Sequence, residues 1–274
     1  MAVDPAAGPE SRGAAARPSW WVESLVIVWL CWVYDAITNF APLRLHAAVS
    51  HGEGVLAAER WLGIDPELSL DRWLAGHHAL GLAVSDYYDN AHFVVTLGLL
   101  GWLWARRADI YRPLRNVLVL TNVIAFAVFW LYPVAPPRML AGDGFSDVVA
   151  STHAFGSWHT GALASAANQL AAMPSLHMAW AAWCGVALWR LARGAWLRGV
   201  ALLYPCMTAF AVLATGNHYV LDVLAGFATL GVAMGIEATV CRKIRLPRVA
   251  HVTNLLRSLI PGRLKPSSQA VHER

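Results

Sequence analysis

The sequence predicts an all-α fold: a polytopic membrane protein with a six-transmembrane-helix bundle and an extracytoplasmic amphipathic helix. Of the 274 residues, 57% are hydrophobic and only 14% are charged, a composition that excludes an ordinary soluble domain. A helix that crosses a bilayer needs roughly 17 to 25 apolar residues. Six stretches meet this requirement, at about residues 20–40, 88–105, 114–132, 173–190, 199–216 and 218–240.

The basic residues predict how these helices are oriented. Loops rich in Lys and Arg stay in the cytoplasm, and with the amino terminus inside, all but four of the 21 Lys and Arg residues are cytoplasmic. The four outer basic residues are Arg44, Arg60, Arg72 and Arg138. We therefore expect a multi-pass protein of the cell membrane with both termini in the cytoplasm.

The chain divides into three predicted parts. Residues 1–18 are rich in Ala, Pro and Gly and lack periodicity, so we expect a disordered cytoplasmic terminus. Residues 19–240 hold the six helices and every candidate functional residue. Residues 241–274 form a basic cytoplasmic tail that we expect to contact anionic lipids of the inner leaflet, and the net charge of +4 requires no nucleic acid partner.

The outer segment between the first two spans predicts a short helix on the membrane surface. Asp65 is the expected N-cap, Pro66 the first helical residue, and Glu67 an acidic residue of the first turn. Apolar residues follow at spacings typical of an amphipathic helix. Two roles stay open for this segment, a lid that packs against the bundle or a gate for substrate.

Two polar motifs stand at the start of long apolar stretches. Residues 173–177 have the sequence MPSLH, and residues 216–222 have the sequence GNHYVLD. The predicted topology places both at the extracytoplasmic face. Polar side chains at membrane depth are costly to keep and usually functional, so the two motifs together predict a membrane-embedded active site.

The residue types in these motifs suit attack on phosphorus. His218 and Asp222 are four residues apart, so the carboxylate can hold one imidazole nitrogen and leave the other free as a nucleophile. His177 is placed to act as a general acid and base. Ser175 is the expected N-cap of the helix that His177 begins, and free amides at a helix start favour an anion.

Four further residues are candidates for substrate binding. Arg138 follows a rigid proline-rich segment and is either an interfacial anchor or a bidentate phosphate ligand. Tyr88 and His92 share a helix face and are candidates to bind a headgroup hydroxyl or a phosphate. Asn217 either contacts phosphate or caps the helix that follows it.

Plainer interpretations compete with catalysis. A single histidine at a helix end is more often a hydrogen-bonding residue of the membrane interface, but two at one face, one with an aspartate four residues on, favour a reactive site. His177, His218 and Asp222 are also acceptable zinc ligands. Because their spacing lacks the additional close ligand of a zinc motif, we expect no metal and no other cofactor.

The two motifs resemble those of the type 2 phosphatidic acid phosphatase superfamily, which carries Pro-Ser-x-His and a downstream His-x-x-x-Asp on a six-helix core. Pro-Ser-Leu-His with Asn-His-Tyr resembles more narrowly the branch that contains fungal inositol phosphorylceramide synthase. The likeness extends over about residues 88–235. It implies that His218 forms a phosphohistidine, that Asp222 orients it, and that His177 donates a proton to the leaving group.

The sequence departs from the phosphatase branch of that superfamily. The Ser-Arg pair that precedes the second histidine by seven and six residues is replaced by Ala211 and Val212. The first phosphatase motif is also missing, since Ala105 stands at its lysine position. Arg138 is the expected substitute for the lost cation, and the losses favour a phosphodiester over a doubly charged phosphomonoester.

The resemblance therefore implies an enzyme, a membrane-embedded transferase that moves a phosphorylated headgroup, inositol phosphate in that branch, from a phospholipid donor to a lipid acceptor. One alternative is a lipid phosphate or polyprenyl diphosphate phosphatase that uses the same His/His/Asp chemistry with water as acceptor. Another is a non-catalytic lipid transporter or scaffold.

Overall fold

The computed structural model describes residues 17–40, 44–152 and 170–258. Within these ranges every regular element is a helix, apart from one isolated parallel bridge between Val134 and Ala171. The prediction of an all-α fold is thus confirmed. Of the terminus predicted to be disordered, residues 1–18, all but Arg17 and Pro18 lie outside the described residues, as do residues 259–274 of the basic tail.

Ten helical elements follow one another along the described chain. Their bounds are α1 Trp20–Phe40, α2 Leu45–Leu62, α3 Glu67–Ala75, α4 His78–Arg106, α5 Ala108–Leu131, η2 Pro137–Met139, α6 Val148–Thr152, α8 Leu176–Leu191, α9 Ala195–Ala214 and α10 Val220–Ser258. The chain divides into two compact units, Met1–Ala233 and Met234–Arg274. All contacts described below lie within the first unit.

Three of the described helices are long and apolar enough to cross a membrane. They are α5, α9 and the Val220–Val240 part of α10, and Trp20–Tyr34 forms a shorter apolar helix. Helix α8 has only 16 residues, whereas α4 has 29 and begins ten residues before the predicted span. The chain is thus a helical membrane protein, and the full set of six spans stays a prediction.

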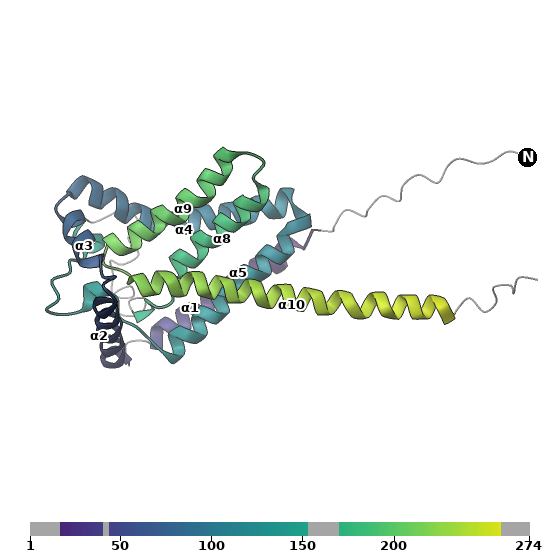
Figure 1. The fold of residues 1–274 in the computed structure, drawn as a ribbon, viewed down its shortest axis with the longest axis horizontal. Coiled ribbons are helices and arrows are strands. Elements are labelled where there is room, and N and C mark those ends of the chain that lie inside the picture. Colours follow the sequence, from purple (N-terminus) through teal and green to yellow (C-terminus); the bar gives the residue numbers. More distant parts are fainter. Residues whose placement is uncertain (1–16, 41–43, 153–169, 259–274) are drawn as a thin grey trace, which may run out of the picture. The chain divides into compact units, whose positions relative to one another are not determined.

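Helices α4, α5, α8 and α9 pack against one another (Figure 1). The indole of Trp183, on α8, is fully buried and donates a hydrogen bond of 2.9 Å to the carbonyl oxygen of Leu114, on α5. A Cβ added at Gly185 would lie 2.7 Å from the carbonyl oxygen of Ala201. The missing side chain therefore lets α8 and α9 approach closely, as small residues do between membrane helices.

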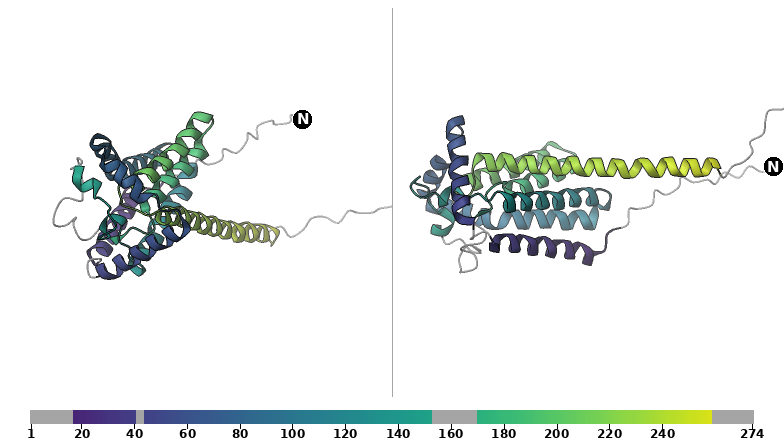
Figure 2. Two further views of the ribbon diagram at one scale, coloured as in Figure 1. Left: turned by 60° about the vertical axis from the view of Figure 1, so that its left-hand side comes forward. Right: turned by 90° about the horizontal axis from the view of Figure 1, so that it is seen from below.

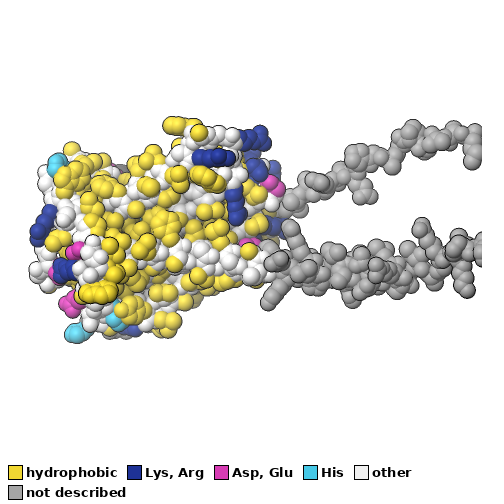
Figure 3. All heavy atoms as spheres, in the orientation of Figure 1, with side chains coloured by type: hydrophobic (Ala, Val, Ile, Leu, Met, Phe, Trp, Pro, Cys, Tyr) yellow, Lys and Arg dark blue, Asp and Glu magenta, His cyan; other side chains and the backbone are white. Residues whose placement is uncertain are grey.

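An apolar surface separates two ends that carry charge. In Figure 3 hydrophobic side chains cover the middle of the visible face, and Lys, Arg, Asp, Glu and His gather toward its ends. Large apolar side chains such as Leu97, Trp130 and Phe227 are exposed. Such an apolar belt between polar ends fits a protein surrounded by lipid.

Helices α2 and α3 lie at one end of the bundle, and α2 runs across the start of α10 (Figure 2, right). The sequence did not predict α2. The helix predicted near Asp65 is present as α3, but Asp65 does not cap it. Pro66 occupies the N-cap position without a side-chain hydrogen bond, and the carboxylate of Asp65 lies 4.0 Å from Arg60. Glu67 turns inward and is fully buried.

Helix α3 packs on the bundle through its last turn. Leu74 is fully buried in a cluster with Val84, Val148, Ala211 and Ala214. Burying one leucine side chain stabilises a fold by about 2 kcal/mol. These contacts favour the packed arrangement that the sequence left open for this segment.

Candidate active site

Three chain segments meet at the end of the bundle that α2 and α3 cover. They are the segments that follow α5, precede α8 and precede α10. Val134 donates its N–H to the carbonyl of Leu170 at 3.1 Å, and Ala172 donates to the carbonyl of Val134 at 3.1 Å. Arg138 donates its N–H to the carbonyl of Gly216 at 3.0 Å. The backbone of Val134 and Arg138 thereby links the segments that carry the two sequence motifs.

His218 is held by two acceptors at a single ring nitrogen. Its Nδ1 lies 2.9 Å from the carbonyl oxygen of Ala172 and 3.3 Å from Oδ2 of Asp222. A carbonyl oxygen can only accept, so Nδ1 carries a proton, and in the neutral ring the lone pair is then on Nε2. The imidazole is 4% exposed, and its tautomer is the one that a nucleophile acting through Nε2 requires.

Asp222 holds the start of α10 as well as the histidine. Its Oδ2 accepts the N–H of Tyr219 at 3.0 Å, and its carbonyl accepts the N–H of Ser175 at 3.1 Å. His218 precedes the first residue of α10, Val220. The contact expected between the carboxylate and one imidazole nitrogen is present, and it is made across the start of α10.

A cluster of aromatic rings surrounds His177. The ring of Tyr88 stacks on that of His177 with centroids 4.4 Å apart, and the ring of His92 meets it edge-on at 4.3 Å. The rings of His177 and His218 are 5.6 Å apart and inclined by 64°. The structure thus brings His177, His218, Tyr88 and His92 into one site, with α4 supplying two of the four side chains.

Ser175 caps α8. Its hydroxyl accepts the N–H of Met178 at 3.3 Å, its backbone is extended, and its side chain is fully buried. The predicted N-cap is confirmed. Because the cap bond uses the hydroxyl, Ser175 holds the helix start beside His177.

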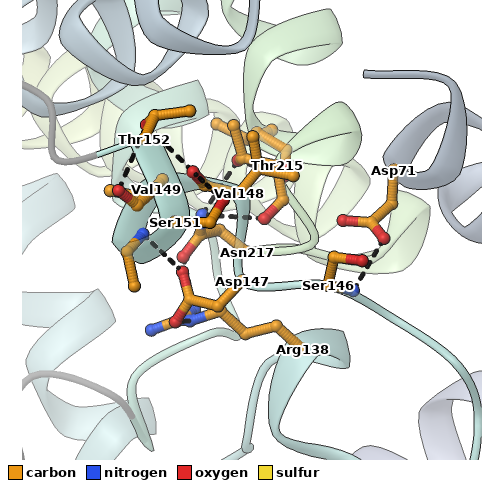
Figure 4. A network of polar contacts seen from close by, with 12 residues as sticks. Asp71, Arg138, Ser146, Asp147, Val148, Val149, Ser151, Thr152, Thr215 and Asn217 are labelled. Atoms are coloured by element: carbon orange, nitrogen blue, oxygen red, sulfur yellow. Dashed lines mark hydrogen bonds and ion pairs between the residues drawn. The ribbon is translucent and has the colours of Figure 1, made fainter. Parts of the chain in front are cut away.

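Arg138 belongs to a polar network at the same end of the bundle (Figure 4). Its guanidinium donates from Nη1 to Oδ1 of Asn217 and from Nε to Oδ2 of Asp147, the latter at 3.2 Å. The Arg138 side chain is only 8% exposed. Arg138 thus contacts Asn217 by its side chain and Gly216 by its backbone, the two residues that precede His218, so the arginine lies next to this histidine's segment.

Asn217 orients the arginine and does not cap a helix. Its amide nitrogen donates to the carbonyl and the hydroxyl of Thr215 at 3.2 and 2.9 Å, and its amide oxygen accepts from Arg138. The alternative of a helix cap is wrong, since side chains of other elements bind the first amides of α10, as described below. Asn217 instead fixes Arg138 beside His218.

A neighbouring carboxylate, Asp71 on α3, anchors the loop that carries Asp147. Its Oδ2 accepts the N–H of Ser146 at 2.8 Å (Figure 4). Burial raises the pKa of Asp71 to about 6. A Cβ added at Gly216 would lie 3.1 Å from Oδ1 of Asp71, so this carboxylate stands close to the turn that precedes Asn217.

Gly216 makes the turn between α9 and the second motif possible. Its φ of 63° lies in the left-handed region, which glycine adopts without a Cβ clash. The turn directs the N–H groups of Asn217 and His218 to the carbonyl of Val212, both at 3.2 Å. The glycine that opens the second motif thus sets the direction in which His218 enters the site.

The sequence did not identify four residues that shape this site. Ala172 acts through its backbone, which leaves no signal in a side-chain pattern. Asp147 and Glu59 lie in segments without a recognisable motif, and Glu67 was predicted only as an acidic residue of a helix start, so their burial or pairing in the structure reveals them. His153 and His159, which the sequence left without a role, lie outside the described residues.

Within the described residues, no group of three or more His, Cys, Asp or Glu side chains is arranged to hold a metal ion. His218 and Asp222 contact each other through Nδ1, so this nitrogen is already engaged. The side chains present form hydrogen bonds among themselves and with the backbone.

The helical bundle and its site define a class, a membrane-embedded protein with a buried His–Asp pair next to a second histidine and an arginine. The chain belongs to the PAP2 superfamily, whose family model matches residues 53–236. No curated protein and no solved structure matches the chain. Membership of this superfamily shows that the chain is an enzyme of the lipid phosphatase or phosphotransferase type.

The structure also shows what replaces the missing Ser-Arg pair. Ala211 is buried against Leu74 in the contact between α9 and α3. Val212 is fully buried, and its carbonyl accepts the two amides of the second motif. Apolar packing occupies these positions, so neither of them offers a guanidinium to a phosphate group.

Proposed function

We propose that this enzyme is a lipid phosphotransferase, which moves a phosphorylated headgroup from a phospholipid donor to the hydroxyl group of a second lipid. The observation that carries the proposal is the pairing of His218, whose Nδ1 is held by two acceptors, with His177 at a ring distance of 5.6 Å. This arrangement supports a nucleophile and a proton carrier on either side of one phosphorus atom.

In the first step Nε2 of His218 attacks the phosphorus of the donor lipid. A nitrogen–phosphorus bond forms, and the bond from phosphorus to the diacylglycerol oxygen breaks. His177 gives its proton to that oxygen, so diacylglycerol leaves neutral. Asp222 and the Ala172 carbonyl stabilise the positive charge that develops on the imidazole.

In the second step the acceptor hydroxyl attacks the phosphorus held on His218. Its proton passes to His177, the nitrogen–phosphorus bond breaks, and the enzyme returns to its starting state. Arg138 and the amides at the start of α8 are placed to stabilise the phosphoryl oxygens in both steps. Tyr88 and His92, which contact His177, are placed to orient the headgroup and the proton carrier.

The distribution of cations supports transfer of a diester headgroup over hydrolysis of a monoester. A phosphate monoester brings close to two negative charges and a diester brings one. Among the described residues of the site Arg138 is the arginine present, and Asp147 already shares its charge. From the resemblance of the two motifs to the inositol phosphorylceramide synthase branch, we infer that the headgroup is inositol phosphate.

We further propose that the protein spans the cell membrane six times, with both termini in the cytoplasm and the site on the extracytoplasmic side. The asymmetry of basic residues supports this orientation. The helices α1, α4, α5, α8, α9 and α10 are the six proposed spans. The basic tail then lies against anionic lipids of the inner leaflet.

The test uses purified full-length protein in lipid nanodiscs that contain phosphatidylinositol as donor and ceramide as acceptor. Mass spectrometry follows diacylglycerol and the new phospholipid, and a colorimetric assay follows inorganic phosphate. A parallel sample contains phosphatidic acid alone. We expect diacylglycerol and the new phospholipid in equal amounts and no phosphate release in either sample.

Release of inorganic phosphate from phosphatidic acid, without a new phospholipid, would overturn the proposal in favour of the lipid phosphatase. Retention of function by His218→Ala would favour a transporter or scaffold. A radiolabelled headgroup that remains on the protein after acceptor is withheld, and is lost in acid, would support a histidine adduct.

A further inference from the structure

The start of α10 is capped by carboxyl groups from two other helices. Oε1 of Glu59, on α2, accepts the N–H of Leu221 at 2.6 Å, and Oε1 of Glu67, on α3, accepts the N–H of Val220 at 2.8 Å. These amides belong to the first turn of α10, where no helix carbonyl is available to them. The same turn carries Asp222, and His218 precedes it.

Both glutamates are fully buried. Each is 0% exposed, and each has a second oxygen, Oε2, that is buried without a donor from the described chain. Because the amides that they bind belong to adjacent residues, the two buried carboxyl groups converge on one turn of α10. Two buried carboxyl groups side by side disfavour the ionisation of both, and a proton kept by one of them can satisfy an oxygen of the other.

We propose that Glu59 and Glu67 form a proton-sharing carboxyl pair that fixes the start of α10, and thereby positions His218 and Asp222 for catalysis. The pair carries one negative charge next to the positive end of the helix dipole, which is a favourable arrangement. The positioning of His218 and Asp222 for catalysis rests on the proposed function, whereas the shared proton and its effect on the stability of the fold do not.

Titration of Glu59 fits this arrangement. Burial raises the pKa of its carboxyl group to about 9, the Leu221 amide opposes the rise, and the neighbouring Glu67 and Asp222 add to it. The neutral form of Glu59 is therefore the one that the folded protein favours at neutral pH. Loss of its proton would place a second negative charge between Glu67 and Asp222.

Charged and titratable groups of neighbouring segments act on Glu59 and Glu67. The hydroxyl of Tyr219, from the segment before α10, interacts electrostatically with both glutamates. Arg60 of α2 is directed away from the pair to Asp143 at 2.8 Å. Asp222 acts on Glu59, and Asp143 acts on the Tyr219 hydroxyl together with both glutamates. His218 meets the pair only through Asp222, and Arg60 and Asp65 contact each other. Asp71 of α3 binds the Ser146 amide.

The sign of the linkage follows from the raised pKa. A carboxyl group whose folded pKa exceeds its unfolded value stabilises the fold below the unfolded value, about 4.5, and loses that contribution as the pH approaches about 9. Glu59→Gln keeps an acceptor for Leu221 and a donor for Glu67 and has no proton to lose. It reproduces the neutral form at every pH.

The first experiment measures thermal unfolding of the full-length protein in detergent without substrate, from pH 5 to pH 9.5. Wild type, Glu59→Gln and Glu53→Gln are compared, because Glu53 is an exposed carboxylate on the same helix. We expect the Tm of wild type to fall relative to that of Glu59→Gln by about 5 °C or more between pH 6.5 and 9. Glu53→Gln should follow wild type.

The second experiment measures kcat and KM on the lipid donor that the enzyme turns over. Glu59→Gln should keep kcat within about twofold at pH 7 and lack the decline of wild type toward pH 9. Glu59→Ala frees the Leu221 amide and should lower kcat by ~10- to 100-fold, since small misplacements of reacting groups cost this much. KM should change by less than about threefold, because the pair touches no substrate.

Parallel Tm curves for wild type and Glu59→Gln would overturn the shared proton, whatever the substrate proves to be. An unchanged kcat in folded Glu59→Ala would overturn the positioning role. If Glu59→Ala fails to fold, kcat of Glu67→Gln at pH 9 tests the positioning role in its place. This variant removes the repulsion and should lack the alkaline decline in kcat of wild type, and a decline equal to that of wild type would overturn the positioning role.

Discussion

Nδ1 of His218 lies closer to the carbonyl oxygen of Ala172, at 2.9 Å, than to the carboxylate of Asp222, at 3.3 Å. The backbone of the segment before α8 thus holds the proton of the imidazole together with the aspartate. In a His–Asp pair without a second acceptor, loss of the carboxylate permits the wrong tautomer and costs ~10⁴ in rate. Here the carbonyl keeps Nε2 available when the carboxylate is absent.

We therefore expect Asp222→Asn to be less damaging than His218→Ala. The asparagine removes the charge that stabilises the imidazolium, and kcat should fall by ~10- to 100-fold. His218→Ala removes the nucleophile and should lower kcat by ~10⁴-fold or more. Steady-state turnover of the lipid donor measures both.

An exposed histidine provides the control for these variants. His78 stands at the start of α4 with its side chain in solvent, so His78→Ala should retain wild-type kcat. Equal inactivation by Asp222→Asn and His218→Ala would mean that the Ala172 carbonyl does not hold the tautomer.

Arg138 supplies a planar cation whose position is fixed by Asn217 and Asp147. Arg138→Lys keeps the charge but loses the fork that can bind two oxygens. A hydrogen bond to a charged group contributes about 1.5 to 3 kcal/mol, so kcat/KM should fall by ~10- to 100-fold. Arg72→Lys, at an exposed arginine of α3, is the matched control and should change kcat/KM by less than about twofold. A tolerated Arg138→Lys would point to an interfacial anchor.

The apolar runs were sufficient to predict most of the long helices, because a lipid-facing helix needs a continuous apolar stretch wherever it lies. The i,i+4 spacing of Tyr88 and His92 also predicted correctly that they share one face. Helix α2 gave no such signal. Its glycines, histidines and acidic residues become interpretable only through the partners they meet in three dimensions, such as the Leu221 amide for Glu59.

Asp71 provides a pH-dependent contribution to stability that is separate from that of Glu59. Burial raises the pKa of its carboxyl group from 3.8 to about 6. The folded state then favours the protonated form, so this contribution is present below about pH 4 and is lost as the pH rises through about 6. Asp71→Asn keeps an acceptor for the Ser146 amide and cannot titrate.

We expect the Tm of wild type to fall relative to that of Asp71→Asn between pH 4 and pH 6 and to run parallel above pH 7. Thermal unfolding in detergent measures this difference. Asp65→Asn, at an exposed aspartate, should follow wild type throughout. A difference that stays constant between pH 4 and pH 6 would contradict the titration of Asp71 in this range.

Two glycines of α2, the buried Gly52 and the exposed Gly54, offer a test of how closely this helix approaches the site. A Cβ at Gly52 would lie 2.7 Å from the carbonyl oxygen of Ala135 and 2.8 Å from the hydroxyl of Tyr219, whereas a Cβ at Gly54 meets nothing within 4 Å. The hydroxyl of Tyr219 already donates to the Ala135 carbonyl at 2.9 Å. Neither neighbour can withdraw without breaking that bond.

Replacing glycine by alanine inside a helix gains about 0.5 to 1 kcal/mol when the added methyl group meets no obstacle. Gly54→Ala should therefore leave Tm unchanged or raise it slightly. Gly52→Ala should lower Tm, since overpacking costs about 1 to 3 kcal/mol, and it should also lower kcat because α2 carries Glu59. A Gly52→Ala protein as stable and active as Gly54→Ala would show that α2 does not lie against Tyr219 in the membrane.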